Sequence, residues 1–185
     1  MIYVAIFFAA LLAMEGVAWL THRYLMHGPL WSLHRSHHRR REGRFERNDW
    51  FGVIFAAPSI VLIALGMEGR PALLAIGLGM TAYGVVYFLV HDVLVHRRVQ
   101  HAFVPSRGYL NRIVRAHLMH HRTTTKEGAV SFGFVFCDRP EKLRERLEAN
   151  RRRLQDLPAS RLQVREAQAG YPRADQQCEG QRQVG

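Results

Sequence analysis

The sequence predicts an all-α protein: an integral membrane helical bundle with three spans, or four, and a histidine-rich metal site on its cytoplasmic side. Three observations predict this fold. Hydrophobic residues make up 48% of the 185 residues and are gathered into long runs. Charged residues are almost absent from those runs. Ten of the eleven histidines fall into two blocks of matching spacing outside them. At this length we expect about one domain.

Residues 1–20 form the first apolar stretch, which is interrupted only by Glu15. A helix of about 20 apolar residues crosses a bilayer, so this stretch predicts a span. A cleaved signal peptide is the alternative, but the stretch has neither a basic start nor a small-residue cleavage site. Cleavage would also leave His22 at a frayed terminus, so we expect the span to be retained.

Two further uncharged runs, residues 50–67 and 71–90, predict a second and a third span. Only residues 68–70 separate them, which indicates a tight helical hairpin. A fourth apolar stretch, residues 129–136, is too short to span. We expect it to dip into the membrane interface or to cover the site, and a four-span bundle is the alternative.

The basic residues set the expected orientation. The formal net charge is +11, and of the 26 lysines and arginines all but Arg70 lie in residues 21–49 or 91–185. Such a charge also suits a nucleic-acid-binding protein. Here it flanks uncharged runs, which is typical of a membrane protein, and no nucleic acid is expected. Both histidine blocks lie on the basic side of the spans, and the positive-inside rule makes that side cytoplasmic.

The last part of the chain differs in composition. Residues 140–157 are rich in Glu, Arg and Leu, with Leu143 and Leu147 spaced for one face of a helix. Beyond them the chain is rich in Gln, Arg and Gly and has no periodicity. We place the membrane domain in residues 1–150 and a charged, disordered tail in residues 151–185. Neither cysteine fits a metal or redox spacing.

The two histidine blocks share the pattern HxxxxH followed by HxxHH. Neutral imidazole is a common metal ligand, and ten ligands are too many for one ion, so the blocks predict a two-metal centre. Residues three and four apart share a helix face, so each HxxHH triplet is expected to converge on one point. A five-residue step turns a helix by about 140°, so the HxxxxH pairs are expected to flank a helix end or to serve different metals. The candidate ligands are His22, His27, His34, His37, His38, His91, His96, His117, His120 and His121.

Interfacial histidines that contact lipid headgroups are the alternative interpretation, but two matched sets of five favour a metal. The eleventh histidine, His101, falls outside both sets and is expected at the surface. Arginines among the histidines would orient the protein in the membrane and offer a docking surface to an acidic electron-transfer partner.

Four other residues are candidates for supporting roles. Glu15 is the one ionisable group inside a span, where such groups are usually functional. It would accept the free ring N–H of a ligating histidine, or else be a hydrogen-bonded structural residue. Asp92 adjoins His91 and would do the same, with helix capping as the alternative. Tyr83 and Tyr87 would line a substrate pocket leading to the metals, or else pack within the bundle.

The ordered motifs resemble a known family. HRYLMHGPLWSLHRSHH, FERNDWFGVIFA, GMTAYGVVYFLVHDVLVH, RGYLNRIVRAHLMHH and KEGAVSFGFVF are similar to segments of bacterial β-carotene hydroxylases. These belong with the membrane-bound non-haem di-iron oxygenases: fatty acid hydroxylases, sterol oxidases and desaturases. The resemblance covers about residues 10–147 and leaves out His101.

The resemblance implies a non-haem di-iron monooxygenase in the bacterial cytoplasmic membrane. It would add a hydroxyl at carbon 3 of each β-ionone ring, converting β-carotene to β-cryptoxanthin and then zeaxanthin. It also implies that the ten histidines bind two iron ions, that no further residue is catalytic, and that O₂ is a co-substrate. Electrons would come from a ferredoxin and its NAD(P)H-dependent reductase, since the chain has no nucleotide-binding motif or iron–sulfur cysteine set. A fatty acyl or sterol substrate, a desaturase reaction and a non-enzymatic metal binder are the alternatives.

Overall fold

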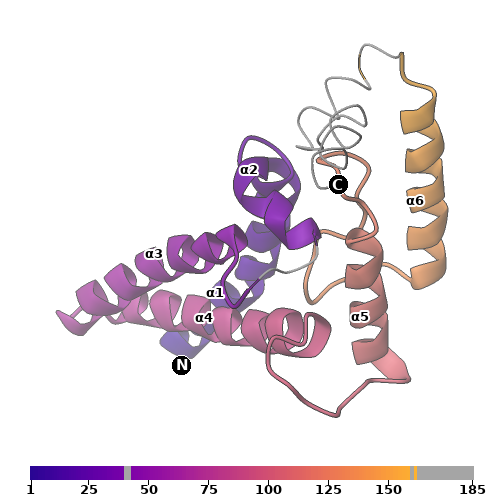
Figure 1. Ribbon diagram of the computed structural model, residues 1–185. Helices are drawn as coiled ribbons and strands as arrows, with labels where there is room; N and C mark the ends of the chain where they lie inside the picture. Colours follow the sequence, from indigo (N-terminus) through magenta and orange to yellow (C-terminus); the bar gives the residue numbers. More distant parts are fainter. Residues whose placement is uncertain (40–42, 159–160, 162–185) are drawn as a thin grey trace, which may run out of the picture.

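The computed structural model describes residues 1–39, 43–158 and 161, and within them it contains helices and loops but no strand (Figure 1). Two of the helical segments are π-helices, η1 and η4, and each directly continues a long α-helix. The elements are α1 (Ile2–Leu20), η1 (Thr21–Met26), α2 (Trp31–His34), the 3₁₀ turns η2 (Arg35–His38) and η3 (Arg47–Asp49), α3 (Trp50–Met67), α4 (Pro71–Tyr87), η4 (Phe88–Val95), α5 (Gly108–His120) and α6 (Pro140–Gln155).

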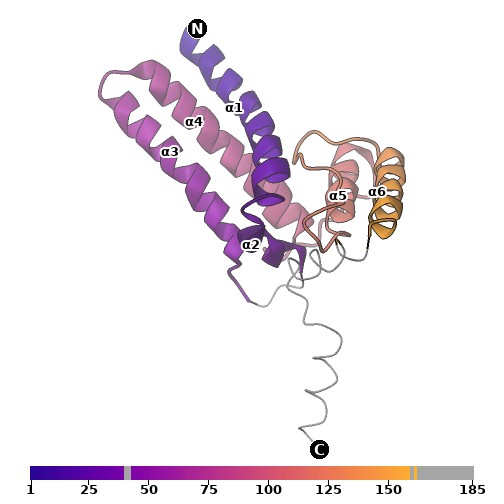
Figure 2. The same cartoon turned by 90° about the horizontal axis from the view of Figure 1, so that it is seen from above.

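Three helical segments are long and apolar enough to cross a membrane, as the sequence predicts. They are Ile2–Met26, Arg47–Met67 and Pro71–Val95. The middle of the bundle is α4, which packs against both α1 and α3. In Figure 2 the α3–α4 turn lies towards the same end as the N-terminus, while α2, α5 and α6 gather at the other end. The segments that carry the histidines therefore lie at one end of the spans.

Small residues let the three spans approach closely. A Cβ atom added to Gly79 would lie 2.6 Å from the carbonyl oxygen of Phe7 on α1, and one added to Gly77 would lie 2.9 Å from the carbonyl oxygen of Ser59 on α3. Close backbone approach through small residues is how helices commonly pack in lipid. The Ser59 hydroxyl adds a hydrogen bond to the Gly77 carbonyl oxygen at 2.8 Å.

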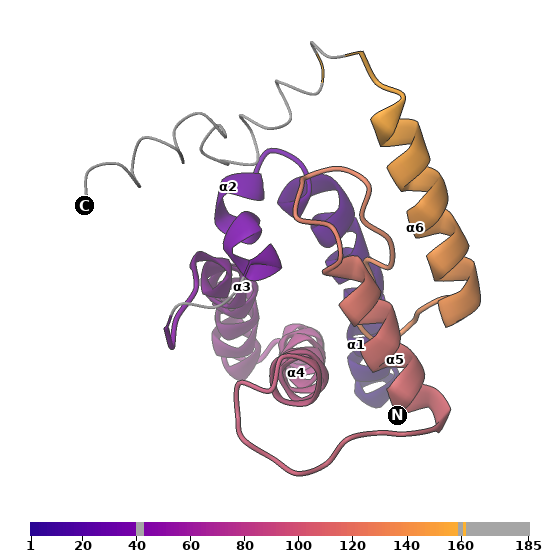
Figure 3. The same ribbon diagram turned by 45° about the vertical axis from the view of Figure 1, so that its right-hand side comes forward.

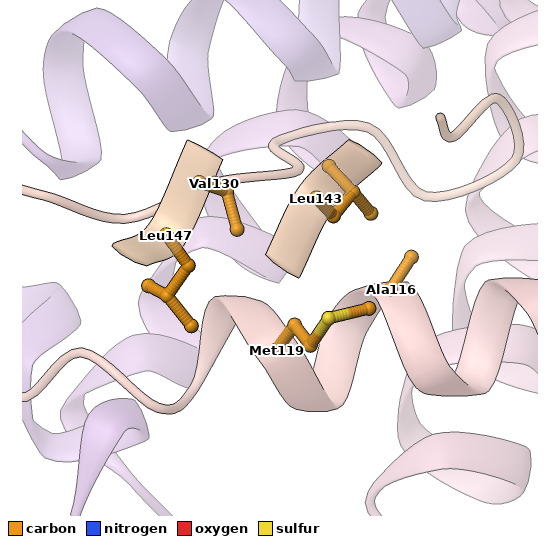
Figure 4. Packing of buried hydrophobic residues seen from close by; sticks show 5 residues of the cluster. All are labelled: Ala116, Met119, Val130, Leu143 and Leu147. Carbon is orange, nitrogen blue, oxygen red and sulfur yellow. The ribbon is translucent and has the colours of Figure 1, made fainter. Parts of the chain in front are cut away.

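The helices α5 and α6 lie side by side beside the bundle (Figure 3). Their contact is a small apolar cluster in which Leu143 and Leu147 of α6 meet α5 and the loop before α6 (Figure 4). This confirms the predicted helix after Pro140 and its leucine face. The predicted division at residue 150 stays a prediction, and the tail beyond residue 161 lies outside the described residues.

The fourth apolar stretch is a loop. Ala129, Val130, Phe132 and Phe134 are all buried although the segment has no regular secondary structure. Among the described residues no fourth helix could span a membrane. Of the two roles expected for this stretch, the structure shows that it covers the histidines.

Candidate metal centre

A π-helical turn holds each HxxxxH pair together. The amide of His27 donates to the carbonyl of His22 at 3.0 Å, and the amide of His96 donates to that of His91 at 2.9 Å. This i→i+5 bond defines a π-helix, a form that recurs at functional sites. It brings residues five apart onto the same face. The rotation of about 140° expected for the pair assumed α-helical geometry. Each pair lies at the end of a span, which is the first of the two expected arrangements, and both members join one cluster, so the alternative that they serve different metals was wrong.

The ten histidines gather into two clusters of ring nitrogens. Nine of them form two groups in which the ligand atoms lie within 4.8 Å of one another. The tenth, His121, joins the second group because its Nε2 lies 2.9 Å from that of His117. Cluster 1 is His22, His27, His34, His38 and His120; cluster 2 is His37, His91, His96, His117 and His121.

The middle histidine of each HxxHH triplet crosses to the other cluster. His34 and His38 belong to cluster 1, but His37 lies with Nε2 2.9 Å from that of His91. In the second triplet His120 crosses, with Nε2 3.1 Å from that of His38. The prediction that each triplet converges on one point was therefore wrong. On an α-helix, residue i+4 is rotated by about 40° from residue i and residue i+3 by about 60° in the opposite direction, so the middle histidine points about 100° away from the last one.

The spacing of the Nε2 atoms suits a metal ion shared by the imidazoles of each cluster. Neighbouring Nε2 atoms are 3.1–3.2 Å apart in cluster 1 and 2.9–3.1 Å apart in cluster 2. With metal–nitrogen bonds of about 2.0–2.1 Å, two ligands at a right angle lie about 2.8–3.0 Å apart and two at the tetrahedral angle about 3.3–3.4 Å. The neighbouring Nε2 atoms therefore have separations of the size that ligands of one ion have.

In cluster 1 every histidine uses its other nitrogen to donate to a neutral oxygen. His22 Nδ1 donates to the Phe132 carbonyl at 2.8 Å, and His34 Nδ1 to Asn48 Oδ1 at 2.7 Å. His27, His38 and His120 donate to the carbonyls of Lys126, Thr123 and Val130. Because the proton is on Nδ1, the five Nε2 atoms face one another as lone pairs. Lone pairs that face one another repel, and a cation placed between them would be attracted by all five.

In cluster 2 two histidines bond to carboxylates. His37 Nδ1 lies 3.2 Å from Glu46 Oε2, and His91 Nδ1 lies 3.0 Å from Asp92 Oδ1. The bond of Asp92 to the ring N–H of His91 is the supporting role that the sequence predicts for this residue. The guanidinium of Arg98 pairs with both oxygens of Asp49 at 2.6 Å and lies 3.6 Å from Asp92.

Burial keeps the imidazoles neutral. Desolvation lowers the pKa of His27 to about 4, and desolvation with the neighbouring histidines lowers that of His34 to about 3 and that of His121 to about 2. The pKa values of the buried His37, His38, His117 and His120 are also well below the usual value, first because of desolvation and then because of nearby histidines. Neutral imidazole is the form that binds metal.

Glu15 bonds to the loop of residues 129–136, which covers the histidines, and its four hydrogen bonds in the described structure go to groups other than histidine. Its Oε1 accepts three backbone N–H bonds, from Phe134 and Val135 at 2.9 Å and from Phe136 at 3.0 Å. Its Oε2 accepts the hydroxyl of Tyr83 at 2.6 Å. The prediction of a direct bond to a ligating histidine was wrong, because these four donors already occupy the carboxyl group. The structural alternative describes its position.

A large cavity between the spans reaches the histidine end. Its volume is about 1010 Å³, and it is lined mostly by apolar side chains of α1, α3 and α4. Tyr83 and Tyr87 both line it, although no histidine does, and both also pack in the core of the bundle. Their role in a substrate pocket stays a prediction. Phe134 separates the cavity from the metal positions: its ring stacks on His22 at 5.2 Å and also contacts His91 and His117. Tyr87 stacks on His91 at 4.5 Å.

His101 is only half-buried and lies in neither cluster. Its Nε2 donates to the carbonyl of Val93 at 2.7 Å. The prediction of a surface residue was wrong in part, since this bond fixes the side chain to the end of η4.

Sequence reasoning missed several residues of the site. Asn48 and Glu46 lie in the FERND segment, where Asn48 was expected only to cap the second span and Glu46 was given no role. Backbone carbonyls supply four of the five partners in cluster 1, and a carbonyl leaves no mark in the sequence. Phe134 was recognised only as part of an apolar stretch. A polar residue just before a span is the signal that identifies Asn48 and Glu46 in retrospect.

The fold and the site define a class of protein: a bundle of membrane-length helices that carries a two-centre polyhistidine site at one end. The chain belongs to the fatty acid hydroxylase family, whose sequence model matches residues 7–140. No solved structure matches the chain.

The similar curated proteins are carotene hydroxylases. A β-carotene hydroxylase of Pseudescherichia vulneris is 52% identical over 134 residues, covering 72% of this chain and 76% of the relative. One of Pantoea ananas is 51% identical over 142 residues, covering 77% and 81%. A chloroplastic β-carotene 3-hydroxylase of Arabidopsis thaliana is 39% identical over 140 residues, covering 74% of this chain and 44% of the relative.

Proposed function

We propose that the protein is a β-carotene 3-hydroxylase, which hydroxylates both β-ionone rings to give zeaxanthin through β-cryptoxanthin. The observation that carries the proposal is the pair of polyhistidine clusters at the end of an apolar cavity within the spans. Bacterial relatives named β-carotene hydroxylase, 43–52% identical, support the substrate. The plant relative named 3-hydroxylase supports the ring position.

We propose further that each cluster holds one iron ion and that residues 1–150 form the di-iron hydroxylase domain. Bound iron supplies oxidation by O₂ at an unactivated C–H bond, which zinc lacks because it has no redox chemistry. The chain's own part is to present ten neutral imidazoles with their Nε2 atoms already spaced for the ions. Eight of the ten clustered histidines are buried, which keeps water away from most of the reacting region. No side chain beyond the ligands is assigned a catalytic role.

The cavity is the proposed site of the reacting ring. Aromatic side chains line it near the histidine end, and glycine and alanine leave room for a flat, branched hydrocarbon. A carotenoid dissolved in the bilayer would enter from the spans with its ring towards Phe134 and Tyr87. Phe134 and Tyr87 at the histidine end of the cavity would orient the ring, and orientation alone contributes strongly to rate.

Electrons are proposed to come from a ferredoxin and its NAD(P)H-dependent reductase. We place the metal centre at the cytoplasmic face of a bacterial inner membrane, where these partners would reach it. The arginine-rich surroundings of the clusters would attract an acidic donor and speed its association.

The test is expression in a bacterium that makes β-carotene. The wild type is expected to produce zeaxanthin, and His37→Ala and His120→Ala are expected to reduce it at least 100-fold, since each removes a ligand. His101→Gln, the histidine outside both clusters, is the matched control and is expected to stay active. Unchanged β-carotene with a well-expressed wild type would overturn the proposal.

The family's name gives one specific reason to keep a second candidate, a hydroxylase of fatty acyl chains. The same experiment separates the two. Hydroxylated membrane acyl chains together with unchanged β-carotene would establish the second candidate and exclude the first.

A further inference from the structure

The two clusters differ in the groups that accept the Nδ1–H of their histidines. All five Nδ1 atoms of cluster 1 donate to neutral oxygens, four carbonyls and the amide of Asn48. In cluster 2, His37 and His91 bond instead to the carboxylates of Glu46 and Asp92. Their Nε2 atoms are 2.9 Å apart, so both would contact the same ion.

We propose that Glu46 and Asp92 make the two metal positions unequal, so that cluster 2 binds a divalent metal ion more tightly than cluster 1. The inference rests on the proposed function only in taking the clusters as metal sites. It assigns Glu46 and Asp92 a positioning and tuning role that acts through His37 and His91.

The physical basis is ligand basicity. An imidazole whose N–H donates to a carboxylate becomes a better electron donor at its other nitrogen than one that donates to a carbonyl. Each carboxylate also places negative charge one ring's width from the ion, in an interior where water screens little: the exposed fractions of the Glu46 and Asp92 side chains are 12% and 15%. Both effects favour a cation in cluster 2.

A fixed framework holds the two carboxylates in place. Asp49 accepts the backbone N–H of Glu46 at 2.9 Å, and Glu46 closes the reciprocal capping box at the start of η3. Arg98 ties Asp49 to the end of the third span through two bonds of 2.6 Å and reaches Asp92 at 3.6 Å. Arg98 thus pairs with Asp49 and approaches Asp92, and the capping box holds Glu46, so both carboxylates are fixed beside their histidines.

The sequence also offers a reciprocal change. Asn48 bonds to Nδ1 of His34 in cluster 1, as Glu46 bonds to Nδ1 of His37 in cluster 2. Both residues lie at the turn just before α3. Asn48→Asp would give cluster 1 a carboxylate at the same kind of position. Glu46→Gln and Asp92→Asn keep an acceptor oxygen and remove only the charge.

The test is a titration of the full-length protein in detergent, stripped of metal by a chelator and then given Co²⁺ alone under anaerobic conditions. The wild type is expected to bind two ions in two separate steps. Glu46→Gln and Asp92→Asn should each weaken the tighter step about 10–100-fold, the usual cost of a lost ligand partner, and leave the weaker step unchanged. Asn48→Asp should strengthen the weaker step.

Ligand variants assign the steps. The tight step should survive in His34→Ala, which damages cluster 1, and disappear in His91→Ala, which damages cluster 2. Iron-57 added at one equivalent should give one dominant Mössbauer doublet in the wild type, and two comparable ones in Asp92→Asn. Two equal steps in the wild type, or loss of the tight step in His34→Ala, would overturn the inference.

These readouts do not depend on carotene. A protein that makes no zeaxanthin and still binds two Co²⁺ ions unequally would refute the proposed function and keep this inference. A protein that makes zeaxanthin and binds the two Co²⁺ ions equally would support the proposed function and refute this inference.

Discussion

Glu15 shows how one residue of the first span controls the loop over the metal centre. Its carboxyl group collects the amides of residues 134–136 and the hydroxyl of Tyr83. That loop in turn supplies the Phe132 carbonyl that orients His22. A substitution at Glu15, whose carboxyl group bonds to the loop and to Tyr83, is therefore expected to reach the metal through the backbone of the loop.

We expect Glu15→Ala to destabilise the fold by about 3 kcal/mol or more, because it leaves several buried donors without a partner. Iron content should fall with it, as His22 loses its orientation. Glu15→Gln keeps an oxygen for the three amides and should lose less than half as much. Thermal unfolding in detergent and iron analysis measure both effects. Equal, wild-type iron content in both variants would contradict this role.

Phe134 is the wall between the cavity and the metals. Its ring touches histidines of both clusters while one side lines the cavity. We expect Phe134→Ala to leave the ligand set intact but to let the ring of the substrate move, which lowers the rate of hydroxylation about 100-fold. Phe134→Leu is the control of similar bulk and should retain more activity.

The measurement is the ratio of zeaxanthin to β-carotene together with iron per protein. A loss of iron in Phe134→Ala equal to the loss of activity would show that the ring supports the ligands and does not position the substrate.

At the scale of elements, the long features were predictable and the local geometry was not. Uninterrupted apolar runs identify three spans because a bilayer demands about 20 such residues. The histidine spacing identified the ten candidates, whose assignment as ligands stays a prediction. The π-turns that make a five-residue spacing productive have no sequence pattern, since they arise when a long helix meets the loops and turns packed at its end. The exchange of His37 and His120 between clusters follows from the same three-dimensional packing.

The helix α6 braces α5, which carries two of the clustered histidines and has a third at its C-cap. Leu143 and Leu147, 1% and 2% exposed, pack on Ala116, Met119 and Val130. Ala116 and Met119 adjoin His117 and His120 in the chain, and the Val130 carbonyl holds His120. Stability of this small cluster is therefore coupled to the ligands that α5 presents.

We expect Leu143→Ala to lower the free energy of unfolding by about 2–5 kcal/mol, the usual cost of a buried leucine truncated to alanine. Glu148→Ala, on the exposed face of the same helix, should change it by less than about 0.5 kcal/mol. Thermal unfolding followed in detergent, with iron retention measured alongside, makes the comparison. A leucine variant as stable as the glutamate variant would show that α6 is not a brace.

For the whole molecule, the arrangement separates two environments. The spans expose apolar side chains along their length and enclose the cavity. The polar partners of the ligands, from Glu46 and Asn48 to Arg98, lie at the end where the chain leaves the spans. A lipid-soluble substrate and a water-soluble electron donor would thus approach the same centre from opposite directions, which explains why the metal positions lie at the end of the bundle.

This arrangement predicts the orientation of the chain in the membrane. The basic residues of the histidine end should keep it in the cytoplasm, with the turn between α3 and α4 in the periplasm. In a background with Cys137 and Cys178 replaced by serine, a single cysteine at exposed Glu68, in the turn between α3 and α4, should react with a membrane-impermeant maleimide in intact cells. A single cysteine at exposed Glu148 should react only after the cells are opened. Labelling of the Glu148 position in intact cells would show that the histidine end lies outside the cytoplasm. It would then contradict the proposed access of a cytoplasmic ferredoxin.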